Sequence, residues 1–219
     1  MEAARRGPKT DWPLPERAFH IADAENWPSI QRHGLFSTSR LIARDRLQGD
    51  AASPFAGHRA TGMRLPSGAL IRDQSPMPPG ALRRCLDAGL TPQDWYDLVN
   101  AKVYFWLNQD RLDRHLAACG ARAQVLVAVD LPALLERHGH AAFLTPFNVG
   151  NARRRPATRG GRSFVPLAAW LADRWLSEAE SGRPARSRSH PPAEIAIEDS
   201  VPDLADFVLD ARPVPARRR

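Results

Sequence analysis

The sequence predicts an α+β domain, because its expected strands and helices follow one another without regular alternation. The strongest strand signals are at 102–107, which is aromatic, and at 124–129, which is apolar from its second residue on. The strongest helix start is Thr91-Pro92-Gln93-Asp94, where Thr can cap, Pro suits the first turn and Asp faces the positive end of the helix. The regular strand-helix repeat of a doubly wound sheet is absent. A chain of 219 residues fits one such domain.

The first half of the chain is expected to begin with a short strand and a helix. Asn26 is the predicted N-cap of that helix, Pro28 suits its first turn and Gly34 ends it. The predicted elements are a mobile Pro- and charge-rich arm, a strand, a helix, a loop, a short strand and a second helix, at residues 1–16, 17–21, 27–33, 48–66, 69–71 and 79–88.

The second half of the chain is expected to contain further helices and strands that pack onto the same core. Three further helices are predicted at 108–119, 131–138 and 165–177, and two further strands at 142–144 and 193–197. Residues 178–192 are expected to form a flexible basic insert, and an apolar segment at 204–209 is expected to return to the core. The domain is therefore expected to span residues 17–211, followed by a basic tail at 212–219.

Composition limits the partners and the location of the protein. The net charge of +7 suits a nucleic-acid partner, but only two of the 31 basic residues are lysines, a skew that a GC-rich coding bias also produces.

No apolar run approaches the roughly 20 residues of a membrane span, and no secretory signal is visible, so a cytoplasmic protein is expected. Cys85 and Cys119 follow no metal-ligand spacing, so no metal is expected.

Two segments at opposite ends of the sequence carry the clearest motif. Near the N-terminus, F-H-I-A at 19–22 is followed by N-W-P-S-I at 26–30 and H-G-L at 33–35. Near the C-terminus, P-A-E-I-A-I at 192–197 is closed by V-P at 201–202. This pair of segments resembles the DarT-like branch of the ADP-ribosyltransferase superfamily, whose pattern runs H-I-T-x-x-x-N-L-x-x-I-x-x-x-G-L and ends A-E-x-L-V-x-x-x-V-P.

The resemblance implies a fold, a substrate and a reaction. The implied fold is a split β-sheet with surrounding helices, in which two facing sheets enclose an NAD cleft. The implied reaction moves ADP-ribose from NAD to an acceptor, with release of nicotinamide. Kinship to DarT-like proteins favours a toxin-like, DNA-binding protein whose acceptor is a base in DNA or RNA. A protein side chain or water remains open as the acceptor, and the family's Thr after the His segment is Ala22 here.

Two other hypotheses about the function remain open. One is a non-catalytic module of the same fold that binds a nucleotide or nucleic acid. The other is an NAD-dependent RNA 2′-phosphotransferase-like enzyme, because the tRNA 2′-phosphotransferases share the fold and a similar opening motif. Those enzymes need further Arg and His residues that have no clear place in this sequence. The oligomeric state is not indicated by the sequence.

The resemblance assigns the N-terminal segment to cofactor binding. In the family, the position of His20 hydrogen-bonds a ribose of NAD, and the helix that follows can offer its N-terminus to a phosphate. Residues at matching spacing extend the predicted site, and the whole set is His20, Ile21, Asn26, Gly34 and Leu35.

Glu194 is the candidate catalytic carboxylate. Strand alternation places Glu194 and Glu198 on the same face, so alternation does not separate them. The resemblance of the following D-S-V-P to the family's tail favours Glu194. A carboxylate here would stabilise a cation-like sugar and accept the proton of the nucleophile.

Two more residues complete the predicted site. Arg72 is the candidate that binds the NAD phosphates, and it is also a candidate catalytic residue. A planar guanidinium can bind a pyrophosphate through two hydrogen bonds. Its rivals are Arg40, Arg44 and Arg46. Tyr104, in the aromatic strand, is the candidate that stacks on nicotinamide.

Overall fold

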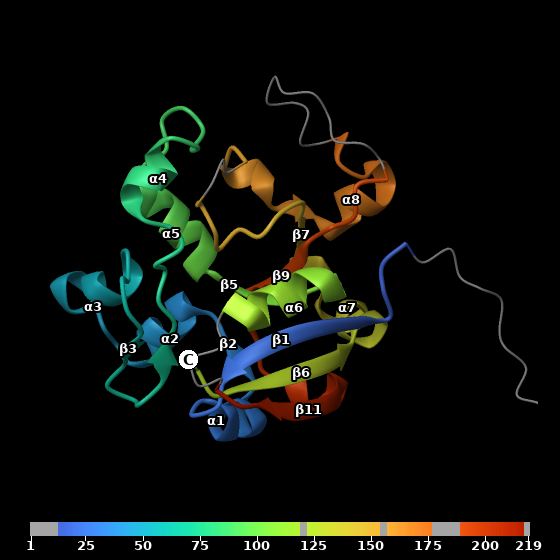
Figure 1. The fold of residues 1–219 in the computed structure, drawn as a ribbon, viewed down its shortest axis with the longest axis horizontal. Helices are drawn as coiled ribbons and strands as arrows, with labels where there is room; N and C mark the ends of the chain where they lie inside the picture. The colour runs from blue at the N-terminus through green and yellow to red at the C-terminus, as the bar shows by residue number, and fades with distance from the viewer. Residues whose placement is uncertain (1–12, 119–121, 154–156, 177–188, 217–219) are drawn as a thin grey trace, which may run out of the picture.

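The computed structural model describes residues 13–118, 122–153, 157–176 and 189–216. Their centre is a seven-stranded sheet in the order β11-β6-β1-β5-β9-β7-β8, in which all neighbours are antiparallel (Figure 1). The strands of this sheet are β1 (Arg17–Asp23), β5 (Lys102–Trp106), β6 (Gln124–Asp130), β7 (Ala142–Thr145), β8 (Val165–Pro166), β9 (Glu194–Glu198) and β11 (Val208–Val214). With helices around this sheet, the predicted α+β class is confirmed.

The sheet is split between β1 and β5. β1 pairs with β6 along its whole length, but it meets β5 at a single register pair, Phe19 with Trp106. Beyond that pair the two strands diverge, so the sheet has one half made of β11, β6 and β1 and another made of β5, β9, β7 and β8. The predicted pair of facing sheets is thus realised as two halves of one sheet that are joined at one point.

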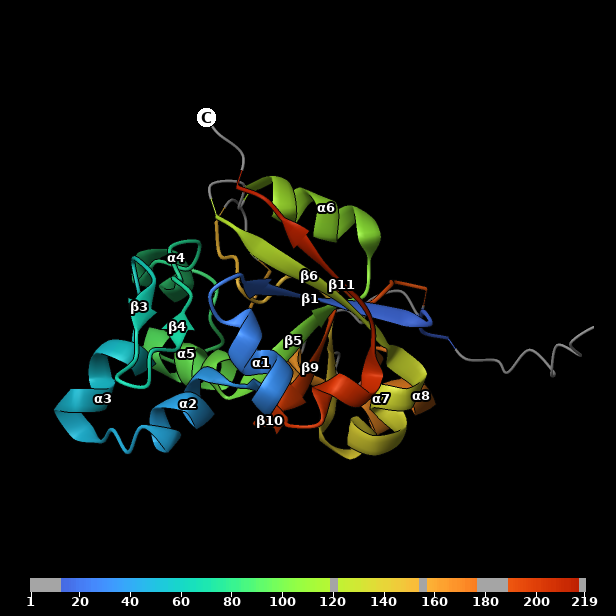
Figure 2. The same cartoon turned by 90° about the horizontal axis from the view of Figure 1, so that it is seen from below.

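Helices cover both faces of the split sheet. Figure 2 shows α6 (Gln109–Ala118) over one face, with α1 (Trp27–His33) and α7 (Leu131–His138) over the other. The larger core lies on the face of α1 and α7, where Val127, Phe105 and Ile195 are fully buried. The α6 face holds a smaller cluster around Trp106 and Leu112. The other helices and 3₁₀ turns are α2 (Thr38–Arg44), α3 (Gly49–Ala56), α4 (Pro79–Arg83), α5 (Pro92–Asn100), α8 (Leu167–Asp173), η1 (Gly139–Ala141), η2 (Gly161–Ser163) and η3 (Leu204–Phe207).

The two motif segments from opposite ends of the sequence lie against each other. β2 (Leu35–Phe36) pairs antiparallel with β10 (Ser200–Val201), with Leu35 opposite Val201. Gly34 has a φ of +81°, and a Cβ built on it would lie 2.4 Å from the Cα of Pro202. Glycine is therefore required at position 34 both by its backbone conformation and by the close approach of Pro202.

Gly34→Ala is expected to lower the free energy of unfolding by more than about 1 kcal/mol, because alanine is strained at positive φ and its methyl group would overlap Pro202. Gly68→Ala is the matched control. Gly68 also has a positive φ of +90°, but nothing lies within 4 Å of the position of its Cβ. Urea unfolding of both variants separates the two effects. Equal losses would mean that the contact between Gly34 and Pro202 contributes nothing.

The predicted loop at 48–66 is wrong in part, because it contains α3 and the short strand β3 (Met63–Arg64). β3 pairs with β4 (Leu70–Ile71), which lies within the predicted strand at 69–71. α3 contains Pro54 and begins at Gly49, which weakens any helical signal in the sequence. Packing of Phe55 and its neighbours onto Ile71 stabilises it instead.

Three other element predictions differ from the structure. The helix predicted at 79–88 is the shorter α4, which ends at Arg83. The helix predicted at 165–177 is the shorter α8, preceded by β8. β11 runs to Val214, so its last three residues lie in the predicted basic tail. Most of the predicted arm and of the basic insert lies outside the described residues, although Leu14 at the end of the arm is buried in the main core. Among the described helices, none is both long and apolar enough to span a membrane.

Candidate functional site

A cavity of about 180 Å³ opens beside the C-terminal half of β1, where β1 has left β5. Its walls come from β1, α1, β2, the start of α2 and β4. Six of the eight predicted site residues line it, namely His20, Ile21, Asn26, Gly34, Leu35 and Arg72. The remaining walls are mainly apolar, with Phe36, Leu41 and Leu70 among them.

His20 lies in the split and connects its two sides. Its Nδ1 is 2.9 Å from the backbone oxygen of Tyr104 on β5, so Nδ1 carries the proton and donates to that oxygen. Burial lowers the pKa of His20 to about 4, and the charge of Arg72 acts in the same direction against the hydrogen bond to Tyr104. The imidazole is therefore neutral at physiological pH, and its Nε2 is a hydrogen-bond acceptor on a wall of the cavity.

Asn26 fixes another part of the cavity wall. Its Nδ2 donates to the oxygen of Leu70 at 2.7 Å and its Oδ1 accepts from the nitrogen of Leu70 at 3.0 Å. Asn26 stands at the N-cap position of α1, but its side chain makes no capping bond, so the predicted capping role is wrong. Its amide is used to join α1 to β4, which leads directly into Arg72.

Arg72 lies at the rim of the cavity. Its Nε donates to Oδ2 of Asp23, on β1, at 3.1 Å. Its Nη2 is buried and has no hydrogen-bond partner among the described residues. A buried guanidinium nitrogen without an acceptor is costly, and a guanidinium on a cavity wall is suited to bind an anion.

The three rival arginines do not line the cavity. Arg40 faces Asp199 at 3.7 Å in an exposed ion pair. Arg44 stacks on the ring of Phe36 at 4.3 Å, and Arg46 is exposed. Because Arg72 lines the cavity and its three rivals do not, Arg72 is the better candidate for binding the NAD phosphates.

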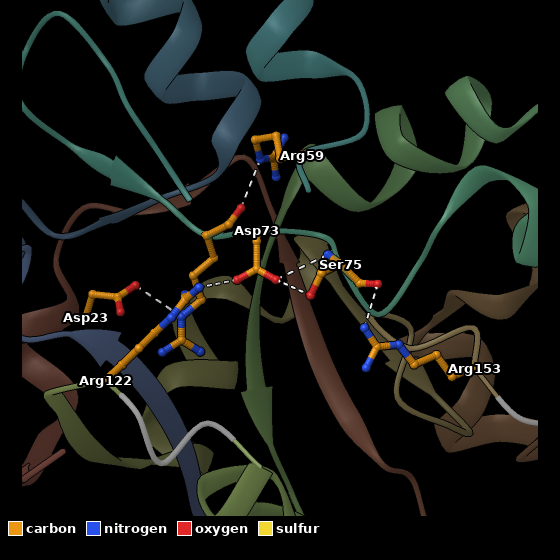
Figure 3. Close-up of polar contacts among 7 residues, drawn as sticks. Asp23, Arg59, Asp73, Ser75, Arg122 and Arg153 are labelled. Carbon is orange, nitrogen blue, oxygen red and sulfur yellow. Dashed lines mark hydrogen bonds and ion pairs between the residues drawn. The ribbon is translucent and has the colours of Figure 1, made fainter. Parts of the chain in front are cut away.

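The segment from Arg72 to Ser75 is held by arginines from three other parts of the chain (Figure 3). Arg122 forms an ion pair with Asp73, whose carboxylate also accepts from the hydroxyl of Ser75 at 2.6 Å. Burial acts to raise the pKa of Asp73, but the bonds from Ser75 and Arg122 outweigh it and lower that pKa below its usual value. Arg153 donates to the backbone oxygen of Ser75 at 3.0 Å.

The third arginine is Arg59, whose Nε donates to the backbone oxygen of Arg72 at 2.9 Å. The figure shows Arg59, Arg122 and Arg153 approaching the segment from separate sides. The segment that carries Arg72 is thus tied to three other parts of the fold.

Glu194 is a buried carboxyl group at the start of β9. Its Oε2 accepts from the nitrogen of Val149 at 3.1 Å and from the hydroxyl of Thr145 at 3.4 Å. Within the described part of the chain its Oε1 has no hydrogen-bond partner. Burial raises the pKa of Glu194 to about 7, against these bonds and the charges of Arg111 and Arg159. The group therefore changes its charge near neutral pH.

Glu198 differs from Glu194 in its surroundings. Glu198 lies opposite Lys102 in the sheet and forms an ion pair with it at 2.7 Å. The Lys102 side chain is 6% exposed and also lies near the rings of Phe143 and Phe164. Glu198 therefore has a structural partner, whereas Glu194 has none of opposite charge within 4 Å among the described residues.

The structure separates the predicted residues into two groups on opposite faces. Cross-strand pairing places Glu194 beside Trp106, so Glu194, Tyr104 and Trp106 share the face that α6 covers. His20 points to the other face, next to Phe105, with 5.7 Å between ring centroids. Tyr104 is packed among apolar side chains and donates its hydroxyl to the oxygen of Val99 at 3.1 Å. Glu194 and Tyr104 do not line the cavity.

Arg72 connects the two groups electrostatically. Its charge lowers the pKa of His20 on one face and, after burial, that of His115 on the other face. The ring of His115, on α6, lies 5.1 Å from the ring of Trp106. Arg72 therefore lies near the open end of the split, within electrostatic reach of both faces.

Sequence reasoning missed the residues that orient the site. Asp23, which pairs with Arg72, lies three residues after His20 and carried no motif of its own. Thr145 and Val149, which hold Glu194, lie at the end of β7 and in the irregular segment after it. Only the position of Asp23, two residues after the end of the predicted strand at 17–21, could have drawn attention to it. No group of three or more potential metal ligands occurs among the residues that the structure describes.

Comparisons with known proteins give a family and two structures. A family model described as a family of unknown function (DUF7002) matches residues 16–208. No curated protein matches the chain. Thermosipho africanus DarTG in complex with ADP-ribose is 13% identical with a TM-score of 0.46, and the match covers 90% of this chain and 43% of that one. Thermus sp. 2.9 DarT in complex with NAD⁺ is 14% identical with a TM-score of 0.39, and the match covers 89% of this chain and 81% of that one.

Both solved structures are of the kind of protein that the two sequence motifs resemble. The chain spans less than half the length of the Thermosipho protein.

Proposed function

This chain belongs to the DUF7002 family, whose function is unknown, and we propose that it transfers ADP-ribose from NAD to an acceptor and releases nicotinamide. The proposal rests on the split between β1 and β5 and on the polar side chains that lie beside it. His20, whose imidazole is neutral, and Arg72, whose Nη2 has no hydrogen-bond partner among the described residues, line a cavity on one side. A buried carboxyl group of raised pKa lies on the neighbouring half of the sheet.

The residues of the cavity suit the sugar and phosphate groups of a dinucleotide. Nε2 of His20 can accept a bond from a ribose hydroxyl, and the guanidinium of Arg72 can donate to a pyrophosphate oxygen. The apolar walls around Phe36 and Leu41 can cover a base. The site thus offers a partner to each chemical part of the adenosine diphosphate half of NAD.

The proposed reaction uses Glu194 as its only acid–base group. The bond between nicotinamide and ribose breaks, and its electron pair leaves with nicotinamide, which becomes neutral. The acceptor's nucleophile forms the new bond to the same ribose carbon and gives its proton to the Glu194 carboxylate. Thr145 and Val149 hold Oε2, which leaves Oε1 for the proton and for the positive charge that develops on the sugar.

For the acceptor, we propose a base in DNA or RNA. The net charge of +7 favours an anionic partner. Near the site, Arg122 is partly exposed beside Asp73, and Arg153 is exposed and lies beside Ser75. Both could contact a phosphate backbone that brings a base toward the split.

The test of the function is incubation of the protein with NAD while free nicotinamide is measured. Parallel samples contain no addition, single-stranded DNA, RNA, or a mixture of proteins. Release that requires one of the nucleic acids, with ADP-ribose found on it, supports the proposal in full. Release into water or onto protein keeps the enzyme class and replaces the acceptor. Binding of NAD without release under any condition favours a non-catalytic module.

His20→Ala is expected to weaken NAD binding by about fivefold, because a ribose hydrogen bond of roughly 1 kcal/mol is lost. His33→Ala is the matched control, since His33 is exposed at the end of α1 and does not line the cavity. Calorimetric titration with NAD measures both. Unchanged affinity in a folded His20→Ala protein would remove the histidine from the site.

A further inference from the structure

Arg59 is a buried arginine between α3 and β3, with 4% of its surface exposed. Its guanidinium donates only to neutral oxygens: the backbone oxygens of Arg72, Phe55 and Gly57 and the side-chain oxygen of Asn100. No carboxylate of the described chain lies within ion-pair distance of it. Such burial without a counterion is costly, so the side chain has a use that an apolar residue would not serve.

The charge on Arg59 persists in this environment. Burial lowers its pKa to about 10, while the nearby charge of Asp73 and the hydroxyl of Tyr96 oppose that change. At neutral pH the side chain is therefore a cation whose bonds to carbonyl oxygens are charge-assisted and strong.

Arg59 holds the segment that carries Arg72 at two points, one at Arg72 and one at Gln74. Its Nε donates to the oxygen of Arg72 at 2.9 Å, and its own backbone oxygen accepts from the nitrogen of Gln74 at 2.6 Å. Asn100, which accepts from Arg59, donates in turn to the oxygen of Ala56 at 2.7 Å. The end of α3, the end of α5 and the Arg72 segment are thereby fixed to one another.

We propose that Arg59 is a positioning residue for Arg72, which keeps the guanidinium of Arg72 at the rim of the cavity and against Asp23. The proposal rests on the proposed function for its effect on NAD, but the positioning itself does not depend on it. Figure 3 shows the contact on which it depends, from Arg59 to the backbone oxygen that precedes the Asp73 segment. Arg59 does not line the cavity, so it acts through Arg72 and not by touching the substrate.

The first measurement is a double-mutant comparison of nicotinamide release. Arg59→Met, which keeps most of the length of the side chain without its donors, is expected to reduce turnover by about 10- to 100-fold through misplacement of Arg72. In an Arg72→Ala background the same change should have no further effect on turnover, although it still lowers the melting temperature. Arg59→Lys keeps the charge without the fork and should show the same pattern to a smaller degree in a well-folded protein.

The matched control is Arg64→Met. Arg64 is an exposed arginine on the neighbouring strand β3, bonded to Glu25 and to the oxygen of Gly68, and it does not contact Arg72. Its replacement should leave turnover unchanged. Independent losses from Arg59 and Arg72, which multiply in the double mutant, would overturn the proposal and leave Arg59 as a structural residue.

A second measurement works whether or not the protein consumes NAD. The Arg72 Nε–H donates to Asp23, so its ¹⁵N NMR signal should exchange slowly with solvent in the wild-type protein. Loss of that protection in Arg59→Met or Arg59→Lys, with the signals of other buried arginines retained, supports the proposal. An unchanged Arg72 signal in both variants overturns it. A wild-type protein without nicotinamide release refutes the proposed function and leaves this result standing.

Discussion

Glu194→Gln is expected to lower the rate of nicotinamide release from NAD by at least about 100-fold, while NAD binding and folding stay close to wild type. The substitution is nearly isosteric, and the glutamine oxygen can still accept the bonds from Val149 and Thr145. It cannot take the nucleophile's proton or offset a positive charge on the sugar. The rate of release and the NAD affinity, measured on the same preparation, separate loss of chemistry from loss of binding.

Glu198→Gln is the matched control, four residues away on the same face of β9. It removes the counterion of Lys102, whose side chain is 6% exposed, so the melting temperature should fall. Turnover should change little. Equal losses of turnover in the two variants would mean that Glu194 has no special role, and loss only in Glu198→Gln would move the catalytic carboxylate to that position.

Arg72→Lys is expected to reduce turnover by about 10- to 100-fold, with little change in melting temperature. Lysine keeps the positive charge but has no fork with which to contact Asp23 and a phosphate together. Loss of one charge-assisted hydrogen bond costs roughly 1.5–3 kcal/mol, which corresponds to this range of rates. Steady-state rates at saturating NAD, together with thermal unfolding curves, measure both quantities.

Arg64→Lys provides the comparison for Arg72→Lys, because Arg64 is exposed on the neighbouring strand and forms an ion pair with Glu25. Full activity in Arg72→Lys would remove Arg72 from the site. Arg→Lys substitutions at Arg40, Arg44 and Arg46 would then show whether one of them binds the NAD phosphates. Their exposed positions outside the cavity predict no effect.

The strands of the sheet were largely predictable, because their apolar and aromatic runs are local signals. Those at 102–107 and 124–129 appear within a residue of the expected bounds. The helix α3 was not predictable, since Gly49, Ser53 and Pro54 disfavour a helix. Packing onto Ile42 and Ile71 stabilises it, together with hydrogen bonds from Arg59 and Asn100 to its last turn. Tertiary contacts of this kind do not show in a local pattern.

The arrangement of the site was predictable only in part. The motif around His20 indicated one wall of the cavity, and the polar character of the segment after Ile71 indicated Arg72. The pairing of β2 with β10 and the contact of Gly34 with Pro202 depend on segments more than 160 residues apart. The hydrogen bond from Arg59 to the backbone of Arg72 likewise comes from a region that was expected to be a loop.

The most direct measurement of the central claim is the rate of nicotinamide release from NAD as a function of pH. In the proposed reaction Glu194 has to be ionised, and burial raises its pKa to about 7. Below that pH the ionised fraction falls about tenfold for each unit, so the rate should rise with pH and level off above about 7. Glu194→Gln should remove this limb of the profile together with most of the rate. A wild-type protein that releases no nicotinamide at any pH, with DNA, RNA, protein or water as acceptor, would contradict the account.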